Sequence, residues 1–457
     1  MPMVKRPYHL PKMLTVNAAE IENGIDINVI EAYIDEHERQ AGRYAYLEAM
    51  YKGFHDVYRE QQKPKWKPDN RLAVNFPRYI TETFTGYGYG VPIKITHESD
   101  DINERILQFI RDNEMTDHDA EMVKNCCIYG HAQEYIYQDE EARTKVKAFT
   151  PRELFTVFDD TIKDHGVFSI RYGYHKTSGR QTNVRYGEIL TAAEIMEFDR
   201  GRIIDRRTNP YGYIPVVEWK LNDERIGLFE QVAGLIEIYD YILSEKANDV
   251  QAFADAYLAV LGAELEEDEI HHIRDDRIIN LYGTDDATKI VVDFLQRPSA
   301  DGTQENTLNR LENLIYKISM VADISDEAFG NATSGIALSY KLLAMSNLAL
   351  TFDRKIEKSL RKRYKIWSSL STNVSDQNVW RDIEIKMSRN IPRNVQEEVE
   401  TAKNLEGITS KETQLSLLSI VSDPKSEIEK IDEEGQKGQD AVLNNTMFRQ
   451  VTADEKQ

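Results

Sequence analysis

Two amphipathic helical segments on either side of a short insert constrain the fold of this chain more than any other feature. Apolar residues recur three and four positions apart in both segments, so each forms a narrow stripe along one helix face. Such a stripe favours packing against a neighbouring helix. The stripes comprise Leu228, Val232, Leu235, Tyr239, Ile242, Val250 and Phe253, and then Leu308, Leu311, Ile315, Ile318 and Ala322. The sequence therefore predicts a helical pair with a small module at its tip.

The insert itself, residues 257–297, has a mixed pattern that Pro298 closes. An apolar run at its start is followed by an acidic helix, Glu264 to Ile273, and by strands near 278–282 and 290–295. Asp301 with Gln304 resembles a capping box at the start of the second stripe.

The N-terminal part alternates helical patterns with turn signals, and short β-branched or aromatic runs then dominate residues 131–220. Helices are expected over 27–60, over 76–84, after a cap at Asp100 or Asp101, and over 117–129, where Gly130 ends the helix. Gly86 to Gly90 is read as a flexible entry into a strand over 91–96. This order predicts an antiparallel α+β region rather than repeated βαβ units.

The C-terminal part is mostly helical. One long helix is expected from Ile336 to Ser369, followed by a strand over 382–387 and by helical patterns over 395–431. The chain after Gly435 is polar, and its last 20 or so residues are expected to be disordered.

Charge limits the function. There are 57 Lys and Arg against 78 Asp and Glu, which gives a net charge of −21. This balance argues against a protein that coats nucleic acid, because such proteins neutralise phosphates with clustered cations. It allows a protein that lets DNA pass without gripping it.

Several other classes are disfavoured. No apolar run reaches the length of a membrane span, and Met1 to Leu14 lacks the apolar core of a signal peptide. Cys126 and Cys127 cannot build a disulfide framework, so a reducing compartment is expected.

Catalytic and cofactor motifs are not found in the sequence. The glycine-rich run follows a helix and has no Gly-Lys-Ser/Thr after it, which argues against a phosphate loop. His271 and His272 are adjacent, so they point to different faces of a helix and do not form a metal pair. The sequence carries no Gly-x-Ser-x-Gly turn, and Thr333 with Ser334 is read as an N-cap pair for the long helix. We therefore expect no catalytic residue, metal or cofactor.

A basic stretch in the long helix has two interpretations. It could be a nucleic-acid patch, or an exposed helix face that pairs with acids on a neighbouring chain, and the interspersed Glu357 favours the second. Its members are Arg354, Lys355, Lys358, Arg361, Lys362, Arg363 and Lys365.

Four motifs in a fixed order carry a resemblance. They are Val74–Ile80 (VNFPRYI), Thr85–Ile93 (TGYGYGVPI), Asn209–Trp219 (NPYGYIPVVEW) and Gly330–Leu338 (GNATSGIAL). Together with the helical pair between them, they resemble the SPP1-type portal proteins of tailed bacteriophages over about residues 25–435. Thr81-Glu82-Thr83 departs from the acidic or Val-Asp pair usual after the first motif.

The resemblance implies an α+β portal fold assembled as a ring, typically of twelve subunits, at one vertex of the viral head. It implies double-stranded DNA driven through the channel by the terminase large subunit, and later attachment of a head–tail adaptor. Major capsid and scaffold proteins are further implied partners. The location implied is the virion, with the host cytoplasm during assembly.

The resemblance also divides the chain. The implied parts are an N-terminal wing (1–225), stem helix 1 (226–253), the clip (254–300), stem helix 2 (301–322), the tunnel loop (323–335), the wing's long helix and returning strand (336–394), the crown (395–435) and a disordered tail (436–457).

Three sets of site residues follow from this division. The tunnel loop would face DNA with Asp323, Ser325, Asp326, Glu327, Asn331, Thr333 and Ser334, whose acids would repel phosphates. The clip would dock terminase and adaptor with Glu266, Glu267, Asp268, Glu269, Asp275 and Asp276. The basic helix would contact a neighbouring subunit. Two alternatives stay open beside this non-enzymatic reading: an adaptor or scaffold protein without a channel, and a phage DNA-processing enzyme.

Overall fold

The computed structural model describes most of the chain. Described are residues 12–17, 20–21, 24–64, 67–162, 165–254, 258–261, 278–281, 291–294, 301–324, 339–391, 395–418, 420–421, 424 and 427–433. The chain forms two compact units, residues 1–324 with 342–390 and residues 325–341 with 391–457.

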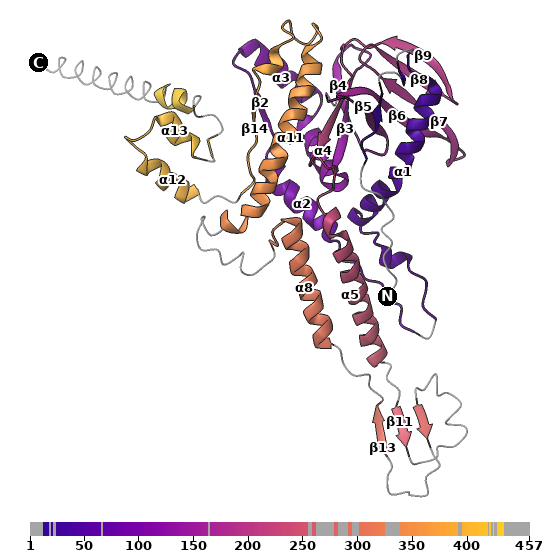
Figure 1. Cartoon of the computed structure of the whole chain (residues 1–457). Coiled ribbons are helices and arrows are strands. Elements are labelled where there is room, and N and C mark those ends of the chain that lie inside the picture. Colours follow the sequence, from indigo (N-terminus) through magenta and orange to yellow (C-terminus); the bar gives the residue numbers. More distant parts are fainter. Residues whose placement is uncertain are drawn as a thin grey trace, which may run out of the picture. The chain divides into compact units, whose positions relative to one another are not determined.

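Helices open the first unit (Figure 1). They are α1 (Ile27–Tyr51), α2 (Phe76–Tyr89), α3 (Asp100–Asp112) and α4 (Met115–Tyr129). Asp26 caps α1 by accepting from the backbone N of Asn28, and Gly130 ends α4 with φ of 87°, as predicted. The helix expected over 27–60 is shorter, since it stops at Tyr51 and only a 3-10 turn, Asp56–Arg59, follows. Ser99, rather than Asp100 or Asp101, is the N-cap of α3.

The glycine-rich run does not enter a strand directly, and that expectation was wrong. Residues Gly86 to Tyr89 complete α2, and the strand β2 begins only at Lys94 (Lys94–Thr96). Tertiary packing overrides the low helix propensity of glycine here. A Cβ on Gly88 would lie 3.9 Å from the Cβ of Ala349, and one on Gly90 only 2.4 Å from the Gly86 carbonyl oxygen.

The β region contains two sheets. The larger has the order β1-β5-β6-β7-β8-β9, antiparallel except for the β1–β5 pair. Its core contains Phe155, Phe168 and Ile170, with Ile30 and Ile34 of α1 packed among them. Its strands are β1 (Thr15–Val16), β5 (Leu154–Asp159), β6 (Gly166–Thr177), β7 (Arg180–Leu190), β8 (Glu194–Asp199) and β9 (Arg202–Thr208). The smaller sheet, β10-β3-β4, consists of β3 (His131–Gln138), β4 (Thr144–Phe149) and β10 (Val216–Lys220).

The predicted helical pair is present. Helices α5 (Ala233–Ala254) and α8 (Asp301–Ser319) lie side by side, joined by an ion pair between Lys246 and Glu305 (Figure 1). Between them in sequence, β11 (Leu258–Leu261) pairs with β12 (Ile278–Leu281) and β13 (Val291–Phe294), close to the strand positions predicted. The acidic helix expected over 264–273 lies outside the described residues.

The long helix α11 (Leu343–Ser368) follows, and β14 (Glu384–Lys386) returns to pair with β2. In the second unit, α12 (Val395–Asn404) and α13 (Lys411–Ser416) agree with the helical patterns predicted there. The mixed helix-and-sheet class is therefore as expected. Among the helices that the structure describes, none combines the length and the apolar character that crossing a membrane requires.

Candidate stem and channel site

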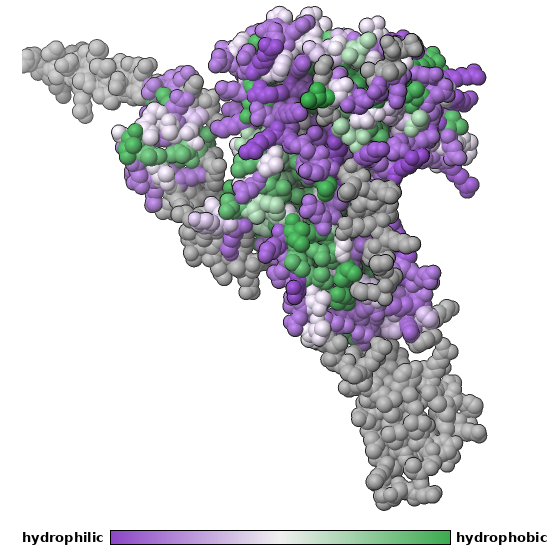
Figure 2. Space-filling view, in the orientation of Figure 1, coloured by the Kyte–Doolittle hydropathy of each residue, from purple (hydrophilic) through white to green (hydrophobic). Residues whose placement is uncertain are grey.

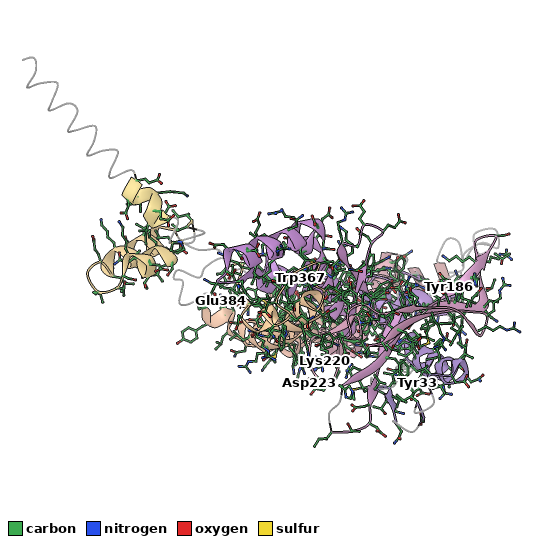
Figure 3. All side chains as sticks on the ribbon, turned by 90° about the horizontal axis from the view of Figure 1, so that it is seen from above. Tyr33, Tyr186, Lys220, Asp223, Trp367 and Glu384 are labelled. Carbon is green, nitrogen blue, oxygen red and sulfur yellow. The ribbon has the colours of Figure 1, made fainter. Side chains whose placement is uncertain are left out.

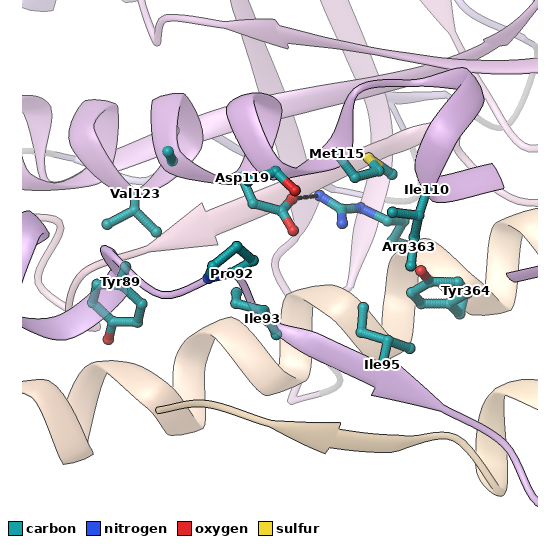
Figure 4. Close-up of a pocket in the computed structure, with 12 residues that line it drawn as sticks. Tyr89, Pro92, Ile93, Ile95, Ile110, Met115, Asp119, Val123, Arg363 and Tyr364 are labelled. Carbon is teal, nitrogen blue, oxygen red and sulfur yellow. Dashed lines mark hydrogen bonds and ion pairs between the residues drawn. The ribbon is translucent and has the colours of Figure 1, made fainter. Parts of the chain in front are cut away.

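The basic helix contains one residue that faces inward. Arg363 of α11 has no exposed side-chain surface, and its Nη2 lies 2.6 Å from Asp119 Oδ1 (Figure 4). The same nitrogen lies 2.5 Å from Glu134 Oε1. His118 Nε2 lies 2.7 Å from the same Glu134 oxygen. Burial alone would raise the pKa of Glu134, but Arg363 and His118 lower it to about 2. These contacts join α11 to α4 and β3.

This cluster also bears on metal binding. His118, Asp119 and Glu134 bring potential ligand atoms within 4.8 Å of one another. The guanidinium of Arg363 contacts both carboxylates, so it supplies the positive charge that a metal ion would otherwise bring. We assign the cluster a structural role.

Three other members of the basic helix have partners within the chain. Lys355 pairs with Asp223 at 2.5 Å, and Asp223 also faces Lys220 (Figure 3). Arg361 pairs with Glu357 at 2.9 Å. Lys365 lies over the rings of Tyr213 and Trp380, at 4.7 and 5.4 Å from their centroids.

Only part of the basic helix is therefore open to a neighbouring subunit. Arg354, Lys358 and Lys362 are exposed, and none has an ion pair among the described residues. For these three, contact with another chain stays a prediction. Arg363 shares a face with Ile356, Leu360 and Trp367, all buried. That apolar spacing was visible in the sequence and could have placed Arg363 in the core.

Helix α5, which the family resemblance predicts to be a stem helix, contains a buried polar stripe that sequence reasoning missed. Glu237, Asp240, Ser244 and Asn248 are all buried, at helical spacing. Three of them accept backbone N–H groups from an extended segment, residues 69–75, that we call the strap. Asn70 donates to Asn248 Oδ1 at 2.6 Å, Leu72 to Ser244 Oγ at 2.9 Å and Val74 to Asp240 Oδ1 at 2.8 Å.

The spacing explains this match. Two residues of extended chain span about 6.6 Å, and four residues of helix rise about 6 Å. Alternate strap amides therefore meet every fourth side chain of α5. The strap leads directly into α2, so these bonds fix the stem helix relative to the helical part of the first unit.

Asp240 has a second buried partner. Its Oδ2 lies 2.5 Å from His55 Nδ1, and both side chains are 1% exposed. His55 Nε2 lies 3.1 Å from the Met50 carbonyl oxygen, so this nitrogen carries a hydrogen and donates. A further proton is then needed between Nδ1 and Oδ2. Burial raises the pKa of Asp240, in agreement with a pair that holds this proton.

The predicted apolar stripes are only partly covered by the α5–α8 contact. Leu308 and Ile315 are buried, whereas Leu235, Tyr239 and Ile242 are half-buried and Val250 is exposed. Gln304 donates to Asp249 Oδ2 at 3.2 Å across the pair. The side chain of Asp301 lies outside the described residues, so the expected capping box stays a prediction.

Apolar side chains remain exposed on α8 and just after it. Ile318 is 43% exposed, Met320 38% and Ile324 50%. Figure 2 shows hydrophobic residues gathered over this part of the stem. An exposed apolar patch of this kind marks an interaction surface.

The upper end of the stem contacts α2 through aromatic rings. Phe76 packs edge-on against Tyr239 of α5 at 5.1 Å and Tyr316 of α8 at 5.9 Å, and Tyr79 packs against Tyr316 at 5.8 Å. Tyr79 also contacts the start of the predicted tunnel loop, since its hydroxyl lies 2.8 Å from the backbone N of Ile324.

Most of the predicted tunnel-loop and clip residues lie outside the described residues. Of the seven tunnel-loop residues predicted to face DNA, Asp323 is described, and Ser325, Asp326, Glu327, Asn331, Thr333 and Ser334 are not. Nor are the clip acids Glu266, Glu267, Asp268, Glu269, Asp275 and Asp276. Their roles stay predictions.

Comparisons with known proteins identify the family. The model of the family described as phage portal protein, SPP1 Gp6-like, matches residues 30–441. The portal protein of Bacillus phage SPP1 is 24% identical over 465 residues, which cover 93% of this chain and 89% of that protein.

Two solved structures are more distant. A chain in the neck of an empty gene transfer agent particle gives a TM-score of 0.45 at 12% identity, covering 75% of this chain and 89% of the other. A chain of a native gene transfer agent virion gives 0.43 at 12% identity, covering 81% and 98%.

The fold and the family match define a structural component of a phage particle rather than an enzyme. The chain belongs to the SPP1 Gp6-like family of phage portal proteins.

Proposed function

We propose that the chain assembles into a ring of identical subunits, twelve by family resemblance, whose central channel conducts double-stranded DNA. The terminase large subunit would drive the DNA inward, and the head–tail adaptor would later bind the same end of the ring. Major capsid and scaffold proteins would surround it, with assembly taking place in the host cytoplasm.

Exposed apolar side chains support the proposal that the chain assembles into a ring. The predicted stem helices leave apolar surface uncovered at Ile318, Met320 and Ile324. Three members of the polar stripe of α5 already bond to the strap, and the fourth, Glu237, accepts from the Tyr46 hydroxyl. A neighbouring copy packed against this surface would bury it, because lateral packing of identical subunits repeats one contact around a closed ring.

Electron microscopy of the purified full-length protein tests the proposal. We expect rings with a central hole slightly wider than a DNA duplex of about 20 Å. Ile318→Lys places a charge in the subunit contact and should shift the protein to monomers, as measured by mass photometry. Ile204→Lys, at a position of β9 that is 64% exposed, is the matched control and should still form rings.

Other outcomes discriminate the alternatives. A stable monomer, or a closed assembly without a hole, would favour the adaptor or scaffold reading. Metal-dependent cleavage of DNA by the purified protein would favour the enzyme. Rings of unchanged abundance with Ile318→Lys would contradict the assignment of this apolar surface to the subunit contact.

A further inference from the structure

We infer that Tyr79 anchors the chain at the point where it leaves stem helix α8. Tyr79 belongs to the Val74–Ile80 motif, which carries the family resemblance but has no structural role predicted from sequence. Its hydroxyl accepts a hydrogen bond from the backbone N of Ile324 at 2.8 Å and faces Asp323 Oδ1, to which it donates, at 3.4 Å. One side chain of α2 thus binds two consecutive residues beyond α8.

The path of the chain before these contacts is also defined. Helix α8 ends at Ser319, and Met320 adopts a left-handed φ of 60°, which turns the chain off the helix axis. Val321 is then buried, with 2% exposure. The chain after the helix is therefore held twice, by burial of Val321 and by the Tyr79 hydroxyl at Ile324.

The position of the hydroxyl is set by ring packing. The Tyr79 ring lies edge-on to Tyr316, whose ring also contacts Phe76. Phe76 reaches Tyr239 on the other stem helix. Rings of both helices, α5 and α8, contact the start of α2. The Tyr79 side chain is therefore held in one orientation, and its hydroxyl has a fixed position.

These contacts give the motif a structural role. Asn75 caps α2 by accepting from the backbone N of Arg78 at 3.0 Å and donates to the Tyr51 carbonyl oxygen, also at 3.0 Å. Phe76 packs between the stem helices, and Tyr79 holds the chain that follows them. The motif therefore joins the stem to the helical part of the first unit at one junction.

The functional consequence rests on the proposed function, because only there does the chain after Ile324 face DNA. Under that proposal Tyr79 is a positioning residue: it contacts no DNA, but it determines where the predicted tunnel loop begins. The anchor itself is a property of the fold and can be tested apart from any channel.

Amide hydrogen exchange of the assembled full-length protein is the direct test. Tyr79→Phe keeps the ring contacts and removes the hydroxyl, so the Ile324 amide should exchange about tenfold faster, the effect of losing one ordinary hydrogen bond. Tyr316→Phe is the matched control, since it removes a hydroxyl from the same aromatic cluster without touching the bond to Ile324. It should leave that exchange rate unchanged.

Each result has a defined meaning. Unchanged exchange at Ile324 in Tyr79→Phe would overturn the anchor, whatever happens to DNA packaging. Faster exchange together with intact rings and less DNA per particle would support the positioning role. Faster exchange with full packaging would overturn the link between the anchor and the channel.

A second variant guards against loss of folding. Ile324→Pro removes the same N–H donor from the other side of the bond. Because Ile324 also belongs to the apolar surface assigned to the subunit contact, packaging is compared per assembled ring. In those rings the variant should reproduce the packaging defect of Tyr79→Phe, and wild-type packaging by Ile324→Pro would count against the positioning role.

Discussion

At the scale of single residues, the buried position of Arg363 could not be predicted from composition. Arg363 stands in a stretch of seven basic residues that the sequence presents as one exposed face. Its guanidinium is instead enclosed by Asp119 and Glu134. Counting charges does not tell which side chain is buried. The apolar residues Ile356, Leu360 and Trp367, at helical spacing from Arg363, do indicate that its face of the helix is buried. The clustered charge was predictable, but the burial of this one member depends on carboxylates more than 200 residues away.

Removing the Arg363 charge should destabilise the first unit strongly. Arg363→Met leaves Asp119 without its guanidinium partner and Glu134 with His118 alone, and breaking such a buried pair typically costs about 3 kcal/mol or more. Chemical denaturation followed by circular dichroism measures the loss. Arg354→Met, an exposed change on the same helix, should stay within about 0.5 kcal/mol of wild type.

The same cluster predicts an acid dependence. The folded-state pKa of Glu134 is lowered from 4.5 to about 2, so its contribution to stability is present above 4.5 and is lost as pH falls toward 2. Arg363→Met should weaken this dependence between those pH values. A variant with the wild-type acid profile would contradict the coupling between Arg363 and Glu134.

At the scale of elements, the helical pair, the strands of the insert and the long helix follow from apolar periodicity. The strap does not, because its bonds join backbone N–H groups to short polar side chains of a distant helix. Asp240, Ser244 and Asn248 read as ordinary polar positions in sequence, and only the folded chain shows that they are buried. Likewise, Gly86 and Gly88 predicted a break, and packing against α11 kept the helix intact.

Two substitutions of Asp240 test whether its pair with His55 holds the additional proton. Asp240→Asn preserves the acceptor for Val74 and offers an amide N–H to His55 Nδ1, so every bond of the protonated pair survives. We expect Asp240→Asn to match wild type in thermal unfolding, and Asp240→Ala to lose about 1–3 kcal/mol.

The sign of the pH effect follows from the raised pKa of Asp240. The stabilising contribution of the protonated pair is complete below the ordinary value of 3.8 and declines as pH rises through the folded-state value. Asp240→Asn should remove that decline. Equal damage by Asn and Ala would show that the pair is an imidazolium–carboxylate ion pair instead.

At the scale of the whole molecule, the net charge of −21 favours the proposed DNA conduit over a protein that binds DNA tightly. A conduit requires weak contacts, since electrostatic grip on phosphates dominates non-specific affinity. The family and the α+β class could be predicted from four ordered motifs, and the family model agrees over residues 30–441. The subunit number could not, because it depends on small packing angles between copies.

The acids of the predicted tunnel loop give a test of the conduit. Asp323 faces the Tyr79 hydroxyl, so Asp323→Asn keeps an acceptor for it while removing the charge. Combined with Asp326→Ala and Glu327→Ala, it should reduce packaged or retained DNA without affecting ring assembly. Packaged DNA per particle is the measurement. Normal packaging by this triple variant would count against a DNA-facing loop.

The sequence of the strap limits the length of its hydrogen-bonded contact with α5. The next pair in its register, beyond Asn70 and Asn248, would join residue 68 to residue 252. Those residues are Pro68, which has no N–H, and Ala252, which has no side-chain acceptor. The series of backbone bonds thus ends at Asn248, and one side-chain bond, from Asn70 Nδ2 to Gln251 Oε1 at 2.7 Å, extends the contact to Gln251. Changes in length or sequence beyond that point can accumulate without altering how the strap holds the stem.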